Sequence, residues 1–545
     1  MRRHTRLPGL ASSGLVGLVG ASGCSATAYS CLPLSSKLSG ENTNLDKLVA
    51  EASMCQPCVP ASTMKVLTAA TALITLSPSF RFETTIVLEK TRRGRPLRVT
   101  LVGAGDASLT SEGLHAAVSR AKHGLRNALK EQEANVVEVG ADDGAFRDGG
   151  KGKPCDEWMA EDLDAGYGVE PSAVVVDGNV AVIEVVSDSG GVAPLVRCKC
   201  ASCTGKPAKR RIDVHGLRVH VVLANDATNN NQHQVCSLRF SRARGAYEVR
   251  GVPSSPVRFV VPVLDAKAWV AHRLAHLLSE VMADDGTEVV VLDANDDEGG
   301  GGGGGVVDVS NSTKVLAVHT SEPLLDFLTR MLHESRNLDA ECLLHVIGAA
   351  KTLKRDHLES TAQLGLRALR SLLSDAAGVE VASRCHISDA SGLSRKNLMT
   401  PCALNALLRH IAFTSTLQPL IACMPSPGDV GATTHSRLPD LKGVLRVKTG
   451  SMNGISALCG YVMDEKSGGM PLACFACISV GGTARLCVDE VARAVYNATT
   501  AAVVVGELPK TIRRHGRWRR NVVVTLVFLV TAFRSSRRKS VVVAR

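Results

Sequence analysis

Residues 59–76 read Val-Pro-Ala-Ser-Thr-Met-Lys-Val-Leu-Thr-Ala-Ala-Thr-Ala-Leu-Ile-Thr-Leu. After Pro60 it contains neither Gly nor Pro and is rich in Ala, Leu and Thr, which predicts a buried helix with Ser62 in its first turn. Lys65 follows three positions later, so both side chains are expected on one helix face. A serine hydroxyl becomes a nucleophile when a neighbouring base takes its proton, and a lysine of depressed pKa can be that base.

Two further strings complete a set with Ser62-x-x-Lys65. Ser335-Arg336-Asn337 interrupts a segment whose apolar residues follow helical spacing on both sides, which predicts a helix–helix joint beside a cleft. Lys448-Thr449-Gly450 ends a β-like run at 444–447, where Lys and Thr can face a carboxylate and Gly permits close backbone approach. Each string alone is an ordinary structural feature. In this order the set is a known signature of class A β-lactamases and penicillin-binding proteins.

The chain resembles the low-molecular-mass class C penicillin-binding proteins, the D-alanyl-D-alanine carboxypeptidase/endopeptidase family, from about residue 45 to 500. Three more segments carry the resemblance: 101–106 is similar to the family's G-G-G-D-P, 388–397 to its D-G-S-G-L-S-R-x-N, and 458–462 to its L-A-G-Y-V. The chain departs from the family pattern at a few positions. Arg336 replaces the usual Asp or Asn, and Ala390, Ala104 and Ala107 replace two Gly and a Pro. Arg336 adds a cation beside the expected cleft, where a change of substrate preference is expected.

The resemblance implies an α/β penicillin-binding/β-lactamase-like transpeptidase fold and a serine-type D-alanyl-D-alanine carboxypeptidase or endopeptidase that acts on peptidoglycan-type peptides. Ser62 would attack the carbonyl of the penultimate D-Ala, Lys65 would accept its proton, and Ser335 would relay the proton to the leaving amine. The oxyanion would be held by backbone N–H groups of Ser62 and Ser451. No metal or other cofactor is expected, and β-lactams are expected to acylate the same serine. The substrate-binding residues that the resemblance implies are Asn337, Lys448, Thr449, Gly450 and Ser451.

Two other classes of function remain open at this point. A β-lactamase-like serine hydrolase or esterase would share Ser62 and Lys65 but needs a base for fast deacylation, and the sequence identifies none. A non-catalytic binding protein descended from the same fold is the other alternative. The intact motifs argue against lost catalysis.

Spacing indicates the domain organisation. Lys65 and Ser335 are 270 positions apart, and in the resembled family this interval holds two inserted domains. Short β-like runs at 173–176, 180–186, 217–223 and 258–263 agree with β-rich insertions. The expected parts are a signal segment at 1–28, a catalytic domain at 40–81 and 312–508, an inserted domain at 82–172 and 261–311, a nested β-rich domain at 173–260 and a tail at 509–545.

The net positive charge of the chain is concentrated in its C-terminal tail. Residues 510–545 hold eleven Lys or Arg and no Asp or Glu, whereas the whole chain has a net charge of +11, so the remainder is close to neutral. With only 3% aromatic residues, nucleic-acid binding is not indicated. The apolar run 522–533 is shorter than the roughly 20 residues that a spanning helix needs. It predicts contact with a membrane surface, with a structureless extension as the alternative.

The N-terminus resembles a secretory signal. Arg2, Arg3 and Arg6 precede the mildly apolar stretch 10–21, and Ala26-Thr27-Ala28 offers an A-x-A cleavage site. We therefore expect an exported, extracytoplasmic protein. The Gly run at 299–305 is expected to be a flexible loop near the return to the catalytic domain.

The chain contains 17 Cys and 16 His. Cys55 and Cys58 form a C-x-x-C pair before Ser62, and three more Cys gather at 198–203. Free thiols, a disulfide and a structural zinc site are all compatible with this pattern. The His residues show no metal-ligand spacing, and His333, two positions before Ser335, is expected on a helix surface.

Overall fold

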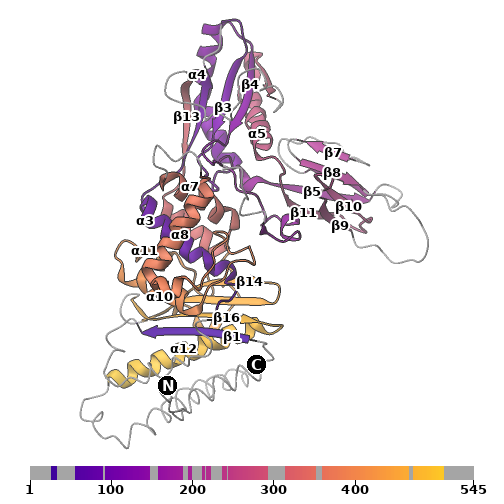
Figure 1. Ribbon diagram of the computed structural model, residues 1–545. Helices are drawn as coiled ribbons and strands as arrows, with labels where there is room; N and C mark the ends of the chain where they lie inside the picture. Colours follow the sequence, from indigo (N-terminus) through magenta and orange to yellow (C-terminus); the bar gives the residue numbers. More distant parts are fainter. Residues whose placement is uncertain are drawn as a thin grey trace, which may run out of the picture.

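The computed structural model describes residues 26–33, 56–89, 93–147, 157–187, 194–198, 211–214, 217–221, 236–241, 243–292, 313–351, 359–464 and 470–507. The chain forms a mixed α/β catalytic part, with helices on both faces of a sheet, and an inserted part that extends away from it (Figure 1). This is the α/β transpeptidase-like fold with inserted β-rich domains that the sequence predicts.

The catalytic part is built from segments at both ends of the described chain. Its strands are β1 (Ala26–Pro33), β14 (Leu445–Met452), β15 (Ile455–Met463) and β16 (Pro471–Val480). Its helices are η2 (Ala61–Met64), α3 (Lys65–Leu76), α6 (Leu324–Glu334), α7 (Asn337–Lys351), α8 (Thr361–Ala377), α9 (Val379–Ala382), α10 (Pro401–Phe413), α11 (Pro419–Cys423), η8 (Pro439–Leu441) and α12 (Ala484–Glu507).

The catalytic sheet has the order β1-β16-β15-β14 and is antiparallel throughout. In β15, Cys459 and Tyr461 belong to the core shared with the helices, whereas Leu458 and Val462 belong to the core shared with α12. Successive strand residues point to opposite faces. The continuous apolar runs of β15 and β16 therefore reflect a sheet that is covered on both sides, with α12 on one side and the other helices on the opposite one (Figure 1).

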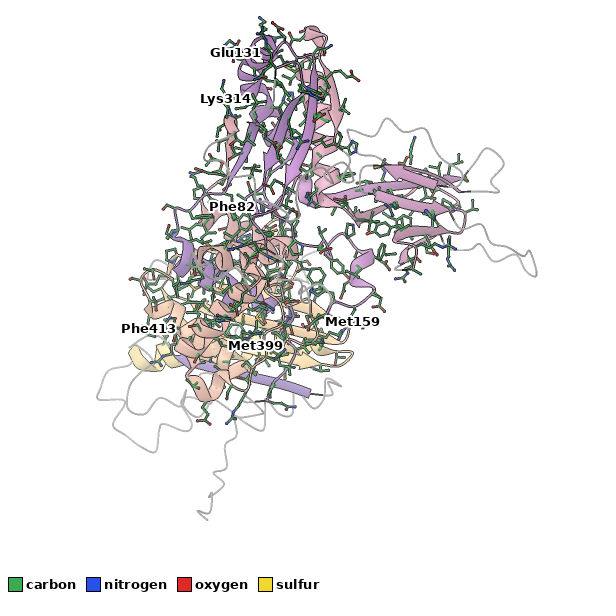
Figure 2. The ribbon with its side chains drawn as sticks, turned by 45° about the horizontal axis from the view of Figure 1, so that its top comes forward. Phe82, Glu131, Met159, Lys314, Met399 and Phe413 are labelled. Atoms are coloured by element: carbon green, nitrogen blue, oxygen red, sulfur yellow. The ribbon has the colours of Figure 1, made fainter. Side chains whose placement is uncertain are left out.

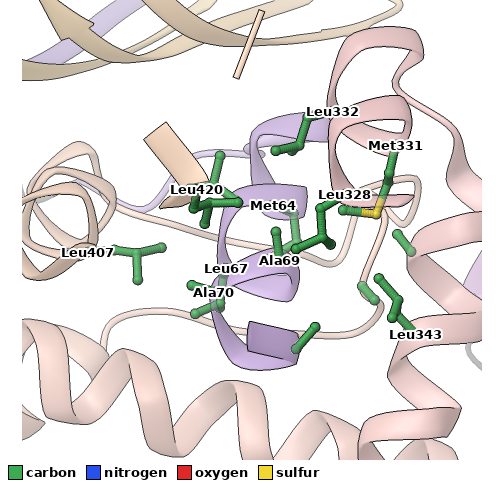
Figure 3. Packing of buried hydrophobic residues seen from close by; sticks show 14 of the residues in the cluster. Met64, Leu67, Ala69, Ala70, Leu328, Met331, Leu332, Leu343, Leu407 and Leu420 are labelled. Carbon is green, nitrogen blue, oxygen red and sulfur yellow. The ribbon is translucent and has the colours of Figure 1, made fainter. Parts of the chain in front are cut away.

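Helix α3 is the centre of the main core. Its residues from Lys65 to Leu73 are all buried. Figure 3 shows Met64, Leu67, Ala69 and Ala70 surrounded by leucines and a methionine from the neighbouring helices α6, α7, α10 and α11. The predicted buried helix is confirmed, and its packing on several sides fixes the position of the preceding turn, which carries Ser62.

The inserted part leaves after α3 and returns before α6. Its larger sheet has the order β12-β4-β3-β2-β13, and two smaller sheets have the orders β11-β5-β6 and β7-β8-β10-β9. Its strands are β2 (Glu83–Glu89), β3 (Leu97–Val102), β4 (Val136–Asp142), β5 (Val180–Ser187), β6 (Pro194–Cys198), β7 (Arg211–Val214), β8 (Leu217–Val221), β9 (Ser237–Ser241), β10 (Ala246–Arg250), β11 (Val257–Pro262), β12 (Glu288–Val291) and β13 (Thr313–Thr320). Its helices are α4 (Ser111–Gln132), η4 (Asp162–Asp164), η5 (Asp177–Asn179), α5 (Ala266–Val281) and η6 (Ala283–Asp285).

The chain enters and leaves the inserted part at one junction. Phe82 lies where the helical layer meets the larger inserted sheet (Figure 2). Its backbone N–H donates to Ser321 Oγ at 2.9 Å, and the N–H of Ser321 donates to the Phe82 carbonyl at 3.0 Å. Strand β13, which ends just before Ser321, pairs with β2. We therefore place the return to the catalytic part after Thr320, whereas the sequence led us to place it at 312.

Some local expectations agree with the structure and others do not. The β-like runs expected at 180–186 and 258–263 coincide, within one residue at each end, with strands β5 and β11. The run at 173–176 is irregular rather than a strand. Strand β1 lies ahead of the expected domain start at 40 and contains Ala26-Thr27-Ala28, where a cleavage site was expected; cutting there would remove three residues of a strand paired with β16.

Several expectations concern residues outside the described ranges. These are the N-terminal segment up to residue 25, the Gly run at 299–305 and the tail at 510–545. Within the described ranges, no helix is both long and apolar enough to cross a membrane.

Candidate active site

The nucleophile turn is a short 3-10 helix, η2, that leads directly into α3. The Thr63 hydroxyl donates to the Pro60 carbonyl at 2.7 Å, which fixes the turn, and Ala61 has a left-handed φ of 47°. The α-helix thus begins at Lys65, a few residues later than the sequence suggested. Ser62 remains half-buried while Lys65 is completely buried.

Lys65 makes three hydrogen bonds inside the protein. Its Nζ donates to Ser62 Oγ at 2.9 Å, to Asn337 Oδ1 at 2.7 Å and to the Ser391 carbonyl at 2.8 Å. Burial lowers the pKa of Lys65 to about 8, although nearby carboxylates, Asp389 first among them, oppose this shift. A substantial neutral fraction near pH 8 makes Lys65 able to take the proton of Ser62.

The predicted joint at 335–337 is confirmed. Helix α6 ends at Glu334, its C-cap Ser335 turns the chain with a left-handed φ of 62°, and α7 begins at Asn337. The two amide atoms of Asn337 point to different parts of the molecule. Oδ1 accepts from Lys65, whereas Nδ2 donates to the Tyr167 carbonyl of the inserted part at 3.1 Å. Asn337 therefore links the base to the insertion.

Lys448 approaches the same place from strand β14. Its Nζ donates to Ser335 Oγ at 2.8 Å and to the Thr449 carbonyl at 2.9 Å. It is completely buried, and burial together with the positive charges of Lys65 and Arg437 lowers its pKa well below the ordinary lysine value.

The K-T-G string lies inside strand β14 and not at its end, because Lys448, Thr449 and Gly450 all pair with β15. A side chain at Gly450 would lie 2.8 Å from the Pro60 carbonyl and 3.1 Å from the Ser62 nitrogen. Glycine therefore allows β14 to pack directly against the nucleophile turn.

A cavity of about 170 Å³ opens between these elements. Four of the residues expected from the sequence line it, and Lys65, Asn337 and Lys448 support it from behind. The described lining residues are Ser62, Ser335, Thr433, Arg437, Thr449, Ser451 and Arg485. The structure thus brings together all eight site residues, which come from three distant parts of the chain.

Sequence reasoning missed the buried carboxylates behind Lys65. Glu341 accepts the backbone N–H of Ser391 at 2.8 Å and that of Ala390 at 3.2 Å, and so fixes the carbonyl to which Lys65 donates. Burial, and then the charge of Asp389, raises the pKa of Glu341 to about 8. The position of Glu341 in helix α7, four residues after Asn337, is a weak sequence signal, since acidic side chains seldom lie on a buried helix face.

Asp389 organises the loop that reaches the nucleophile turn. It accepts the N–H of Gly392 at 2.7 Å, Nδ2 of Asn397 at 2.7 Å and Nε1 of Trp158 at 3.1 Å. A side chain at Gly392, which has a φ of 85°, would lie 1.9 Å from the Ala61 carbonyl. The segment 388–397 was noted for its family resemblance, but its supporting role depends on contacts that sequence does not show.

The cavity wall formed by 433–437 was also missed. Thr433 and Thr449 form a hydroxyl–hydroxyl hydrogen bond of 2.7 Å, and Arg437 donates through Nε to Asp489 of α12 at 2.5 Å. Thr433 and Arg437 lie outside the three catalytic motifs and outside the segments that carry the family resemblance.

Arg336, the departure from the family pattern, is held away from the cavity. Its Nε donates to the buried Asp339 at 2.9 Å, and it also contacts Glu334 at 3.5 Å. Its charge is therefore locally balanced. His333, expected on a helix surface, is half-buried, and this burial lowers the pKa of its imidazole. Its backbone carbonyl accepts the N–H of Thr433 at 3.0 Å.

The cysteine expectations are tested only within the described ranges. Cys58 carries a free thiol, and Cys55 and 199–203 lie outside those ranges. No group of His, Cys, Asp and Glu in the described residues is arranged to hold a metal ion.

Comparisons with known proteins agree with this geometry. The model of the D-Ala-D-Ala carboxypeptidase 3 (S13) family matches residues 36–493. A D-alanyl-D-alanine carboxypeptidase of Actinomadura sp. is 30% identical over 74% of this chain and 70% of its own length. D-alanyl-D-alanine carboxypeptidase DacB of Haemophilus influenzae is 26% identical over 78% of this chain and 82% of its own length.

Solved structures show the same fold. The crystal structure of penicillin binding protein 4 from Haemophilus influenzae is similar with a TM-score of 0.62, at 20% identity, over 88% of this chain and 99% of that one. A second structure of that protein, complexed with a β-lactam, has a TM-score of 0.60 over 89% of this chain and 99% of that one.

Proposed function

The chain belongs to the D-Ala-D-Ala carboxypeptidase 3 (S13) family, and from this premise we propose how its own residues perform the reaction. It is a serine-type D-alanyl-D-alanine carboxypeptidase, with endopeptidase activity as the related outcome on cross-linked peptides. One observation carries the residue assignment. Lys65 Nζ donates to Ser62 Oγ at 2.9 Å, is completely buried and has a pKa lowered to about 8, so it is placed and tuned as the base for Ser62.

In the acylation step, Lys65 accepts the hydroxyl proton while Ser62 Oγ forms a bond to the carbonyl carbon of the penultimate D-Ala. The carbonyl oxygen becomes an oxyanion that the backbone N–H groups of Ser62 and Ser451 stabilise. Each such donor is worth on the order of 10²–10³ in rate. The close packing of Gly450 on the nucleophile turn supports this pairing of donors.

Breakdown of the tetrahedral intermediate needs a proton on the leaving nitrogen. Ser335 relays that proton to the amine, because its hydroxyl accepts from Lys448 and lines the same cavity as Ser62. The C–N bond breaks, D-Ala leaves, and Ser62 carries the acyl group. Water then hydrolyses this ester and returns the proton to the site.

Substrate recognition is assigned to the residues around the cavity. Lys448 and Thr449 bind the terminal carboxylate, and Asn337 holds the amide of the peptide while it keeps Lys65 in place. The assignment to Asn337 is supported by its bond to Lys65 and by its link to the inserted part. The proposed substrates are peptidoglycan-type peptides.

β-Lactams react at the same serine, because their strained amide replaces the D-Ala-D-Ala bond. Because hydrolysis of the ester is expected to be slow, the penicilloyl group should remain on Ser62. A lifetime of minutes distinguishes this carboxypeptidase from a β-lactamase, which would turn the adduct over.

The experiment compares the wild-type protein with the Ser62→Ala variant. Fluorescent penicillin should label the wild type, which should also release D-Ala from a D-Ala-D-Ala peptide. The variant should do neither while its thermal unfolding stays nearly unchanged, because only a hydroxyl is lost. Labelling that persists in the variant would contradict the assignment of Ser62.

We further propose that the protein works outside the cytoplasm and that residues 510–545 contact anionic membrane surfaces. Eleven cations around an apolar run support this, because each Lys or Arg near such a surface adds about 1 kcal/mol. A truncation that removes 510–545 should release the protein from anionic vesicles and leave hydrolysis of a soluble peptide intact. Continued sedimentation of the truncated chain with vesicles would contradict the proposal.

A further inference from the structure

Arg437 is a buried cation at the cavity wall with unused hydrogen-bonding capacity. Only 4% of the residue is exposed, yet it lines the cavity together with Ser62 and Thr449. Its Nε donates to Asp489 at 2.5 Å. Its Nη2 is buried and has no hydrogen-bond acceptor among the described residues.

A buried hydrogen-bond donor without an acceptor destabilises the folded protein unless a ligand provides the acceptor. Burying a polar group without a partner costs free energy, and the cost is larger for a charged group. Arginine is also the side chain best suited to planar recognition of carboxylates, since its donors match their geometry. An unsatisfied guanidinium at a cavity therefore indicates a site that is completed by an anion.

The surrounding charges point in the same direction. Arg437 and Lys65 both contribute positive charge at Lys448 and help to depress its pKa. Arg485 adds a fourth cationic residue at the cavity, on the exposed side. The carboxylate of Asp489 pairs with Arg437 through Nε, whereas Nη2 has no acceptor among the described residues. The carboxylate of a ligand would balance the excess positive charge at the cavity.

We propose that Arg437 is a specificity-determining residue, which binds the terminal carboxylate of the peptide together with Thr449 and the neighbouring Thr433. This inference rests on the proposed function and extends its carboxylate subsite beyond the K-T-G strand. Thr433 and Arg437 come from one short segment, and the hydrogen bond of 2.7 Å between Thr433 and Thr449 joins that segment to β14. The subsite thus combines the hydroxyls of Thr433 and Thr449 with a buried guanidinium that lines the same cavity.

The test uses two substrates that differ only at the C-terminus: a peptide ending in D-Ala-D-Ala and the same peptide ending in D-alaninamide. The wild type should hydrolyse the acid much faster than the amide. Arg437→Gln should lower kcat/KM for the acid about 10- to 100-fold, the range expected for losing a hydrogen bond to a charged group. The kcat/KM for the amide should change by less than about threefold, so the preference for the acid over the amide is largely lost.

Two further variants guard against a folding artefact. Arg437→Gln leaves Asp489 buried without its partner, so the double variant Arg437→Gln/Asp489→Asn removes both charges and should show the same collapse of preference. Arg485→Gln removes an exposed cation of the same cavity and should cost clearly less, because solvent screens it. Circular dichroism identifies the variants that fold.

A folded single or double variant that keeps the wild-type preference would overturn this inference alone. Equal losses on the acid and the amide would also overturn it, since they would indicate a structural role for Arg437. A wild type that hydrolyses neither peptide would instead overturn the proposed function.

Discussion

The two lysines of the active site have the same chemistry and opposite surroundings. Lys65, on the helix side, is backed by the carboxylates of Asp389, Glu341 and Asp339, which limit the fall of its pKa to about 8. For Lys448, on the strand side, burial lowers the pKa well below the ordinary value, and the positive charges of Lys65 and Arg437 lower it further. Both are completely buried.

This difference separates their tasks. A base must change its protonation state near the working pH, and the carboxylates behind Lys65 hold it in that range. The side chains of Lys65 and Arg437 both add positive charge at Lys448, so this region favours a substrate carboxylate. The surroundings, more than the residue type, decide which lysine moves a proton and which receives a ligand.

Removing each lysine should therefore have different consequences, and these are the largest effects that we expect. Lys65→Met should lower acylation by about 10³- to 10⁴-fold on both a D-Ala-D-Ala peptide and a small thioester without a terminal carboxylate, because every acylation needs the base. Lys448→Met should lower peptide turnover by about 10²- to 10³-fold but affect the thioester far less, since the thioester lacks the terminal carboxylate that Lys448 binds.

Steady-state kinetics with both substrates measure this contrast, and thermal unfolding checks that the variants fold. Equal profiles for the two variants would show that the lysines share one role.

A smaller effect concerns the hydroxyl of Thr449. Thr449→Val should weaken turnover of the D-Ala-D-Ala peptide on the order of 10²-fold and leave the thioester almost unchanged, because a polar site discriminates by the partner it lacks. Thr449→Ser, which keeps the hydroxyl, is the matched control and should retain most of the activity. If Thr449→Val lowers the turnover of both substrates by the same factor, Thr449 does not recognise the carboxylate.

The smallest effect that we predict is on stability and concerns Glu341. Its pKa is raised from 4.5 to about 8, so between those values the folded protein binds more protons than the unfolded chain. The free energy of unfolding should then fall as the pH rises from about 4.5 to 8. Glu341→Gln removes the titrating group and should flatten this dependence.

Urea unfolding at several pH values in that window measures the slope. Asp389 contributes part of the wild-type slope, because burial raises its pKa as well. Identical slopes in the wild type and the Gln variant would contradict the raised pKa of Glu341.

The sequence predicted those features that depend on local spacing. Ser62 and Lys65 share a helical turn, Ser335 and Asn337 flank a joint, and the β-like runs at 180–186 and 258–263 form strands β5 and β11. These follow from side-chain periodicity, which is a property of neighbouring residues.

Other features depend on contacts between residues far apart in the chain. The carbonyl that accepts from Lys65 belongs to Ser391, 326 positions away, and the Asn337 amide reaches Tyr167 across 170 positions. Arg437 is significant only because folding buries it beside Thr449. Such pairings lack a local pattern, so no spacing rule could have found them.

The pH dependence of acylation by the small thioester tests the central claim most directly, because this substrate needs the base and not the carboxylate subsite. With the Ser62→Ala variant subtracted as background, the rate should rise about tenfold per pH unit below the pKa of Lys65 and level off above about pH 8. A rate that stays constant from about pH 6 to 9 would contradict the assignment of Lys65 as the base.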